Sequence, residues 1–224
     1  MITIPKAVFF DMDGVLYDSM KNHEVTWIES FRIAGIDFSA QQAYLNEGRT
    51  GNSTIHHIYR MQKGRDATEQ ECQLIYNEKT RLMALQPQAP MLPGMKQLIE
   101  ALREHDVTVL VVTGSRQPLL LDKLSNDYGF EPHQIISGYN VTHGKPHPEP
   151  YLKARQRSGA DAVDCVVVEN APLGIQSAKA AGIYTIAVNT GILTNECLWE
   201  QGCDELFAST TSLSTQWIKQ LQGY

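Results

Sequence analysis

Short apolar segments recur along the chain and alternate with stretches of helical periodicity. A short apolar run bounded by turn residues is typical of a strand that is buried on both faces of a sheet. Such runs are Ala7–Phe10, Val107–Val112, Ile135–Ile136, Cys165–Val168 and Ile183–Val188. Helical stretches that begin at Met95, Gln117 and Leu173 lie between them and end near glycine or a polar turn. This alternation predicts an α/β fold, with a doubly wound parallel sheet as a Rossmann-like core.

One interval interrupts the alternation. The residues from Ser19 to Pro90 have helical periodicity but no convincing buried strand. The interval ends in the proline-rich segment QPQAPMLPG, which is typical of a linker that returns the chain to the sheet. We therefore predict a small helical domain over residues 19–90, inserted after the first strand, and a core made of residues 1–18 and 91–224.

Composition and charge exclude several classes of protein. Hydrophobic residues make up 42% and charged residues 20% of the 224 residues, which excludes a disordered, collagenous or coiled-coil chain. The formal net charge of −6 gives no electrostatic support for general binding to nucleic acid or to an anionic membrane. No window approaches the roughly 20 apolar residues of a membrane-spanning helix. The four cysteines have no C-x-x-C spacing, and the first residues lack a secretory signal pattern, so we expect a soluble protein of the reducing cytoplasm.

The first predicted strand ends in a pair of carboxylates. Asp11 and Asp13 follow the apolar run, and Gly14 permits a sharp change of direction. Ligands of open α/β sheets bind at the carboxyl ends of the strands, and side chains two residues apart in an extended chain point the same way. Both carboxylates could therefore face one site. Taken alone, the pair is equally consistent with two loop carboxylates that cap the next helix.

Two later strand ends carry groups that suit an anion. Thr113 and Ser115 flank Gly114 just before a helical stretch, where a hydroxyl group and free amides favour negative charge. A plain helix N-cap is the alternative for these two residues. Lys145 lies in the stiff segment HGKPHP, and a rigidly placed ammonium suits a site crowded with carboxylate and phosphate charge.

A fourth strand end offers oxygen ligands for a cation. Glu169 and Asn170 follow the apolar run that begins at Cys165. Oxygen-rich side chains from neighbouring strand ends describe a site for a hard cation such as Mg²⁺, although a lone Glu-Asn turn is more often a helix cap. Four such signals fall in order at four predicted strand ends, which makes coincidence a poor explanation.

These motifs resemble those of the haloacid dehalogenase superfamily of phosphotransferases. The four signature motifs correspond to DMDGV at 11–15, TGS at 113–115, GKP at 144–146 and EN at 169–170. The resemblance covers nearly the whole chain. The helical insertion resembles the cap domain of the β-phosphoglucomutase-like subfamily.

The resemblance implies a role for each motif residue. Asp11 would be the nucleophile that forms an aspartyl phosphate, and Asp13 the general acid and base. Thr113 and Lys145 would hold the transferring phosphoryl oxygens, and Ser115 would bind substrate. The cofactor would be Mg²⁺. Its expected ligands are the Asp11 carboxylate, the Asp13 main-chain carbonyl, the Asn170 side chain and, through water, Glu169.

Two branches of the superfamily are disfavoured. The dehalogenases lack an acid at the position of Asp13 and need no proton for their leaving group. The phosphonate-cleaving relatives use a cap lysine to form a Schiff base. The corresponding stretch at residues 45–50, LNEGRT, contains no lysine.

One departure from the subfamily suggests a substrate. Asn170 stands where the subfamily usually has aspartate, so the expected cation loses one negative ligand. Our hypothesis is that Glu47, in the cap loop, replaces that charge when the cap closes, although Glu47 could also be a solvated loop acid. A metal-ligating Glu47 would leave little space for an organic leaving group. It would favour inorganic pyrophosphate, with Arg49 and Lys79 as its cationic partners. The overall sequence also resembles the inorganic pyrophosphatase branch of the subfamily.

Other functions stay open. A β-phosphoglucomutase or sugar-phosphate phosphatase is the main alternative, because His23 and Trp27 match positions seen in the mutases. His23 would then bind substrate, although it could equally be a satisfied histidine at the hinge. Asn170 is the single argument for a non-catalytic binding module. We expect a small phosphorylated substrate as the partner, no nucleic acid or membrane, and a monomer as the family default.

Overall fold

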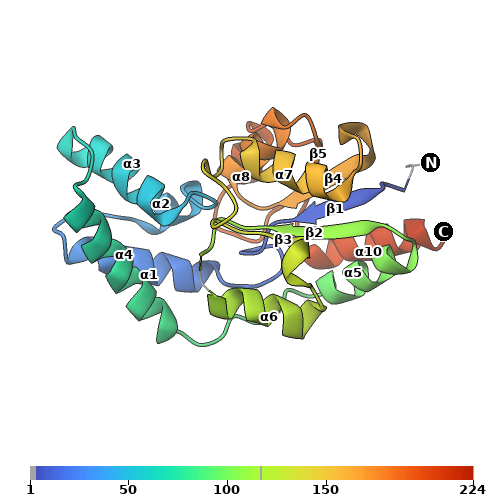
Figure 1. Cartoon of the computed structure of the whole chain (residues 1–224), viewed down its shortest axis with the longest axis horizontal. Coiled ribbons are helices and arrows are strands. Elements are labelled where there is room, and N and C mark those ends of the chain that lie inside the picture. Colours follow the sequence, from blue (N-terminus) through green and yellow to red (C-terminus); the bar gives the residue numbers. More distant parts are fainter. Residues whose placement is uncertain (1–3, 117, 224) are drawn as a thin grey trace.

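A parallel six-stranded sheet forms the centre of the core (Figure 1). The structure, a computed structural model, describes residues 4–116 and 118–223. Adjacent strands follow the order β3-β2-β1-β4-β5-β6, and every neighbouring pair is parallel. The bounds are β1 Ala7–Phe10, β2 Thr108–Val112, β3 Ile135–Ile136, β4 Cys165–Glu169, β5 Tyr184–Val188 and β6 Glu205–Phe207. The predicted fold class is confirmed.

Five of these strands lie where the apolar runs predict them, with shifts of one residue at some ends. The sixth, β6, was not predicted. It has three residues, lies at the edge of the sheet and is only half buried, so it has no apolar run that could mark it.

Helices cover both faces of the sheet (Figure 1). Residues of β1 alternate between the two layers, because Val8 and Phe10 join one hydrophobic cluster and Ala7 and Phe9 join the other. The first layer contains α5 Met95–Glu104, α6 Pro118–Tyr128 and α10 Thr210–Leu221. The second contains α7 Glu149–Ser158 and α8 Pro172–Ala180, with α9 Asn195–Trp199 packed beside α8. Two short 3₁₀ helices, η1 Pro132–Gln134 and η2 Ala162–Asp164, precede β3 and β4. The helix predicted from Gln117 begins at Pro118 in the structure, and Gln117 itself lies outside the described residues.

A separate group of helices lies beyond one end of the sheet (Figure 1). These are α1 Met20–Arg32, α2 Ala40–Leu45, α3 Gly51–Lys63 and α4 Glu69–Ala84. They bury a hydrophobic cluster of their own, in which the Phe31 and Phe38 rings stack with centroids 4.7 Å apart. Capping boxes at Ser39 and Thr68 begin α2 and α4. We call this group the cap.

Two linkers join the cap to the core and run side by side. The Asp18 amide donates to the Pro90 carbonyl at 3.0 Å, and the Leu92 amide donates to the Leu16 carbonyl at 2.8 Å. Both crossings therefore form one paired segment, which we call the hinge, while the domain boundaries at 18–19 and 90–91 stay a prediction. Within the described part of the chain, no helix combines the length and apolar character that crossing a membrane requires.

Candidate active site

The strand order places the motif residues at one crevice. From β1 the chain builds the sheet first toward β2 and β3, and then on the other side through β4, β5 and β6. Ligands of open α/β sheets bind where the order reverses in this way, outside the carboxyl ends of the strands. Asp11, Thr113 and Glu169 end the three central strands β1, β2 and β4, and all three side chains are buried.

A buried ion-pair network joins these strand ends. The Lys145 ammonium donates to the carboxylates of Asp11 and Glu169 and, at 3.1 Å, to the Val112 carbonyl. Burial alone would lower the pKa of Lys145, but the carboxylates of Asp11 and Glu169 raise it above its usual value. Lys145 is therefore a permanent positive charge at the crevice.

The Asp11 carboxyl is buried in the same network. Burial raises the pKa of Asp11 well above the usual value. Lys145 lowers this pKa, whereas the neighbouring carboxylates of Glu169 and Asp13 raise it further. A further positive charge at the crevice would favour the ionised form of Asp11, which is the form that a nucleophile needs.

Glu169 uses both carboxylate oxygens within the protein. Its Oε1 accepts from Lys145 at 2.6 Å and from the Tyr151 hydroxyl at 2.7 Å. Its Oε2 accepts from the amides of Asn170 and Ala171 at 3.0 and 3.3 Å, just before α8 begins. These four bonds hold the carboxylate against Lys145 and the start of α8, and the water-mediated contact with Mg²⁺ stays a prediction.

The Asn170 side chain presents a free oxygen to the crevice. Its Oδ1 is buried and has no hydrogen-bond partner among the described residues. Gly14 packs against the same amide, because a Cβ on Gly14 would lie 1.9 Å from Asn170 Nδ2, and Gly14 also has a positive φ of 82°. An orphaned amide oxygen just after β4, the strand that pairs with β1 before Asp11, fits the oxygen ligands of a hard cation.

Asp13 lies next to the hinge and beneath the cap. The Ser19 hydroxyl donates to its Oδ1 at 2.5 Å, and His23 Nε2 lies 3.3 Å from the same oxygen without forming an aligned hydrogen bond. Burial raises the pKa of Asp13, but His23, Ser19 and Lys79 together hold it below its usual value.

The predicted cap residues gather around Asp13. His23 Nδ1 lies 3.9 Å from Glu47 Oε2, so the imidazole stands between the Glu47 and Asp13 carboxylates. Burial raises the pKa of Glu47, and Asp13 adds to that effect. Burial lowers the pKa of Lys79, whose ammonium lies 5.2 Å from the centre of the Trp27 ring. Glu47 is therefore not the solvated loop acid considered as the alternative.

Arg49 and Ser115 line the same enclosure. A small pocket of about 40 Å³ contains them together with Asp13, Glu47 and Lys79. The Arg49 guanidinium donates to Asn46 Oδ1 at 3.1 Å. The Ser115 amide donates to Thr113 Oγ1 at 3.1 Å, so Thr113 shapes the loop after β2, and α6 begins only at Pro118.

Two contributors were not predicted. Ser19 was identified only as the start of the cap linker, yet its hydroxyl bonds Asp13. Tyr151 lies on α7 and has the pattern of an ordinary core aromatic, yet its hydroxyl supports Glu169. Their roles depend on contacts between segments that are far apart in the sequence.

The cap loop is closed on the catalytic loops. A Cβ on Gly48 would lie 2.8 Å from Lys145 Cδ, and a Cβ on Gly114 would lie 2.9 Å from the Gly48 carbonyl oxygen. Gly144 lies equally close to Thr50, since a Cβ on Gly144 would lie 2.9 Å from Thr50 Cγ2. Only glycine permits this approach.

Gly48→Ala should therefore impair catalysis more than folding. The added methyl group would push against Lys145, whose ammonium is already fixed by two carboxylates, and would keep the cap from closing fully. We expect kcat/KM for the predicted phosphoryl transfer to fall about 10- to 100-fold, the cost of a small misplacement at a reacting centre.

Gly35→Ala is the matched control. Gly35 also has a positive φ, of 63°, but no atom lies within 4 Å of its hypothetical Cβ. The Gly35→Ala variant should therefore have the backbone strain of an alanine at positive φ but keep its activity. Equal losses in both variants would show that strain, and not the contact with Lys145, is responsible.

A family model for haloacid dehalogenase-like hydrolases matches residues 5–182. The chain belongs to this hydrolase family. Its β-phosphoglucomutase-like subfamily is supported by a Bacteroides vulgatus structure provisionally named as a β-phosphoglucomutase. That protein is 41% identical, with a TM-score of 0.93 over 99% of this chain and 91% of its own.

Two curated relatives have named activities. Hexitol phosphatase A of Escherichia coli K12 is 29% identical over 184 residues, which is 82% of this chain and 83% of the relative. β-Phosphoglucomutase of Bacillus subtilis is 27% identical over 193 residues, covering 83% of this chain and 84% of the relative. Together with the family match, these relatives support a phosphatase of the haloacid dehalogenase type.

Proposed function

We propose that this chain is a Mg²⁺-dependent phosphatase that hydrolyses small phosphorylated molecules through an aspartyl phosphate at Asp11. The observation that carries the proposal is the convergence of Asp11, Asp13 and Lys145 at one strand-end crevice beneath a closed cap. A binding module would have no physical need for a nucleophile, an acid and a charge-balancing lysine together. We therefore favour an enzyme over a non-catalytic protein.

Two steps complete the reaction. A carboxylate oxygen of Asp11 attacks phosphorus, the bond to the leaving oxygen breaks, and Asp13 donates a proton to that oxygen. Without substrate the pKa of Asp13 lies below its usual value, so Asp13 takes up this proton as the negative phosphoryl group enters and raises its pKa. Asp13, now ionised, then takes a proton from a water molecule, which attacks phosphorus and releases Asp11 and inorganic phosphate. Asp13 suits both steps because it lies two residues after the nucleophile Asp11. The Ser19 hydroxyl donates to its carboxylate, and the His23 imidazole lies next to the same oxygen.

The remaining residues bind and balance charge. Lys145 and Thr113 would hold the phosphoryl oxygens, with Lys145 kept in place by Glu169. Asp11, the Asp13 carbonyl and Asn170 would hold Mg²⁺, which supplies positive charge that favours an ionised nucleophile and offsets the phosphoryl charge. We assign Glu169 to positioning Lys145, since its oxygens are already engaged.

A phosphorylated sugar or polyol is the substrate class we propose first. The relatives named as hexitol phosphatase and β-phosphoglucomutase act on such molecules according to their names. A cleft of about 980 Å³ also opens beside Asp13, which leaves room for an organic leaving group. This space differs from the expectation that a metal-ligating Glu47 would leave little space for an organic leaving group.

Inorganic pyrophosphate is the second candidate, favoured by the burial of Glu47 beside His23. If Glu47 also binds Mg²⁺, Glu47→Gln should raise the Mg²⁺ concentration for half-maximal phosphate release about 10- to 100-fold. Calorimetric titration with Mg²⁺ should show the same loss of affinity. Glu104→Gln, an exposed acid at the end of α5, is the control. Unchanged Mg²⁺ affinity would remove Glu47 from the ligand set and, with it, the case for pyrophosphate.

A substrate panel tests the proposed function. Phosphate release is measured with Mg²⁺ for a hexitol 6-phosphate, β-glucose 1-phosphate, pyrophosphate and acetyl phosphate, and the glucose 1-phosphate reaction is also assayed for glucose 6-phosphate. We expect Mg²⁺-dependent hydrolysis that chelation of the metal abolishes. No turnover of any compound would contradict a phosphatase. Glucose 6-phosphate without phosphate release would indicate a mutase.

A further inference from the structure

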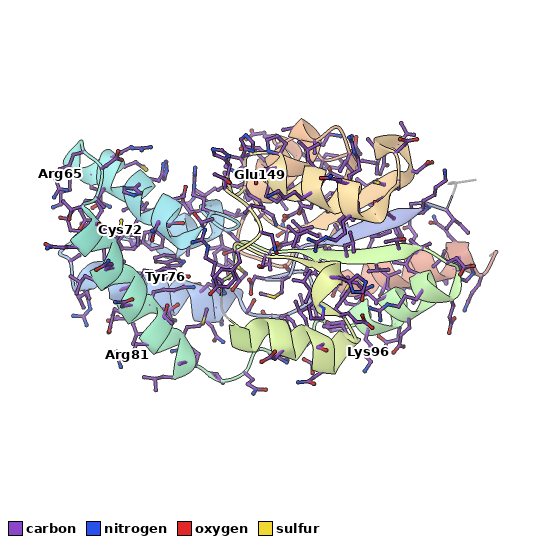
Figure 2. All side chains as sticks on the ribbon, viewed as in Figure 1. Arg65, Cys72, Tyr76, Arg81, Lys96 and Glu149 are labelled. Carbon is purple, nitrogen blue, oxygen red and sulfur yellow. The ribbon has the colours of Figure 1, made fainter. Side chains whose placement is uncertain are left out.

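Three side chains that can bind a metal ion lie together on the segment that carries Lys145. His143 precedes Lys145 by two residues, His147 follows it by two, and Glu149, labelled in Figure 2, begins α7. One ligand atom from each of the three lies within 4.8 Å of the other two. The histidines are exposed and Glu149 is half-buried, whereas Lys145 is buried. We call His143, His147 and Glu149 the histidine cluster.

The spacing within the histidine cluster suits a tetrahedral ion. His143 Nδ1 lies 3.1 Å from Glu149 Oε2, and the two imidazole rings have their centroids 4.6 Å apart. Two ligand atoms that are each about 2.0 Å from a tetrahedral ion lie roughly 3.3 Å from one another. The first two ligands are therefore at the required separation, and the exposed His147 ring needs only a small rotation to join them.

The backbone that carries these ligands is already ordered. Pro146 and Pro148 fix the backbone φ angles on either side of His147. The His147 amide donates to the Gly144 carbonyl at 3.1 Å, and the Ser177 hydroxyl donates to the His147 carbonyl at 2.6 Å. An ion that binds here would therefore lose little affinity to the ordering of the chain.

Glu149 has the supporting contacts that are typical of a ligating carboxylate. Its Oε1 accepts from the Thr142 amide and the Lys153 ammonium, each at 2.9 Å. Its Oε2 accepts from the His143 amide at 2.8 Å. Hydrogen bonds from Lys153 and these two amides lower the pKa of Glu149 to about 2, so the side chain is ionised at neutral pH. Carboxylates that bind metal ions are themselves usually hydrogen-bonded, and Lys153 leaves Oε2 on the side of the imidazoles.

The chemistry of the cluster selects the kind of ion. Imidazole nitrogen suits Zn²⁺, Cu²⁺ and Ni²⁺, whereas Mg²⁺ takes oxygen ligands. Two histidines and one glutamate are a ligand set of zinc sites in which water takes the fourth position. The crevice, in contrast, offers the oxygens of Asp11 and Asn170. The two places should therefore discriminate between the two kinds of ion.

We propose that His143, His147 and Glu149 form a second metal site, which binds a transition-metal dication such as Zn²⁺ at the surface of the catalytic core. The ion replaces the contact between His143 Nδ1 and Glu149 Oε2. It also takes the place of the Glu149 amide, which donates to His147 Nδ1 at 3.1 Å, as the partner of that imidazole. Because its ligands lie on both sides of Lys145, the bound ion holds both ends of this segment. The proposal stands apart from the phosphatase function.

Calorimetric titration with Zn²⁺ in the presence of excess Mg²⁺ tests the site. We expect the wild type to bind one Zn²⁺ that Mg²⁺ does not displace, and His143→Ala and His147→Ala each to weaken this binding at least about ten-fold. Even the loss of a group that only orients a ligand typically costs about 10- to 100-fold. Zn²⁺ should also raise the unfolding temperature of the wild type more than that of either variant, since the ion binds the folded state.

His133→Ala is the matched control. His133 Nδ1 lies 3.2 Å from Glu131 Oε2, nearly the distance between His143 and Glu149, but no third metal-binding side chain in the described part of the chain joins this pair. Its Zn²⁺ affinity should equal that of the wild type. The proposal would be overturned by equal Zn²⁺ affinity in the wild type, His143→Ala and His147→Ala proteins, or by complete displacement of Zn²⁺ by Mg²⁺. Mg²⁺-dependent phosphate release by the same proteins tests the phosphatase separately.

Discussion

Asp11→Asn should lower kcat for every substrate by at least about ten-thousand-fold, the scale seen when a covalent nucleophile is removed. The amide cannot form the acyl phosphate, and the neighbouring carboxylates do not replace it. Glu169 is held by four hydrogen bonds, and Asp13 is held by Ser19 on the hinge side. Phosphate release under single-turnover conditions measures the loss.

The variant should remain folded. Asp11 is a buried carboxyl whose ionisation is opposed by burial, and Lys145 keeps Glu169 as its partner. Circular dichroism and thermal unfolding should therefore match the wild type closely. Residual turnover above about one part in a hundred in well-folded Asp11→Asn protein would place the nucleophile elsewhere.

Glu169→Ala should cause the largest loss of stability. The substitution leaves the Tyr151 hydroxyl and the amides of Asn170 and Ala171 without their acceptor, and removes one of two carboxylates from Lys145. Each buried donor left without an acceptor costs about 1–3 kcal/mol, and Glu169→Ala leaves three such donors, so we expect a loss of at least about 3 kcal/mol. Urea unfolding with metal chelated gives the free energy of unfolding without a contribution from bound cation.

Tyr151→Phe separates the charge from the hydrogen bond. It removes one neutral donor from Glu169 and keeps the aromatic packing on α7, so we expect a loss of about 1 kcal/mol. A loss in Glu169→Ala no larger than in Tyr151→Phe would show that Glu169 is not the anchor of the network.

The sequence predicts the core because short apolar runs and turn residues report strands that are buried on both faces. The runs Ala7–Phe10 and Cys165–Val168 predict β1 and β4 to within one residue, with no information on which strands lie beside them. It fails for β6, where three half-buried residues at the sheet edge produce no periodic signal. The motif acids could be predicted for the same reason, since the carboxyl ends of parallel strands lie at one edge of the sheet regardless of the conformation of the loops.

The functions of individual site residues depend on contacts that the sequence does not contain. The direction of the Glu169 carboxylate is decided by Lys145, Tyr151 and the start of α8, which come from three separate segments. The burial of Glu47 depends on Gly48 allowing the cap loop to approach Lys145. The cleft of about 980 Å³ beside Asp13 is lined by residues of both α4 and α6, and neither helix specifies it alone.

The aspartyl phosphate is the central claim, and Asp13→Asn tests it most directly. Acetate leaves as a stable anion, so acetyl phosphate should phosphorylate this variant without a proton from residue 13, while hydrolysis of the adduct stalls without a base. The measurement is rapid acid quenching followed by mass spectrometry of peptides. We predict one phosphoryl group on the peptide that contains Asp11, in near-stoichiometric amount. A phosphoryl group on a different peptide, or steady phosphate release without any adduct, would contradict the account.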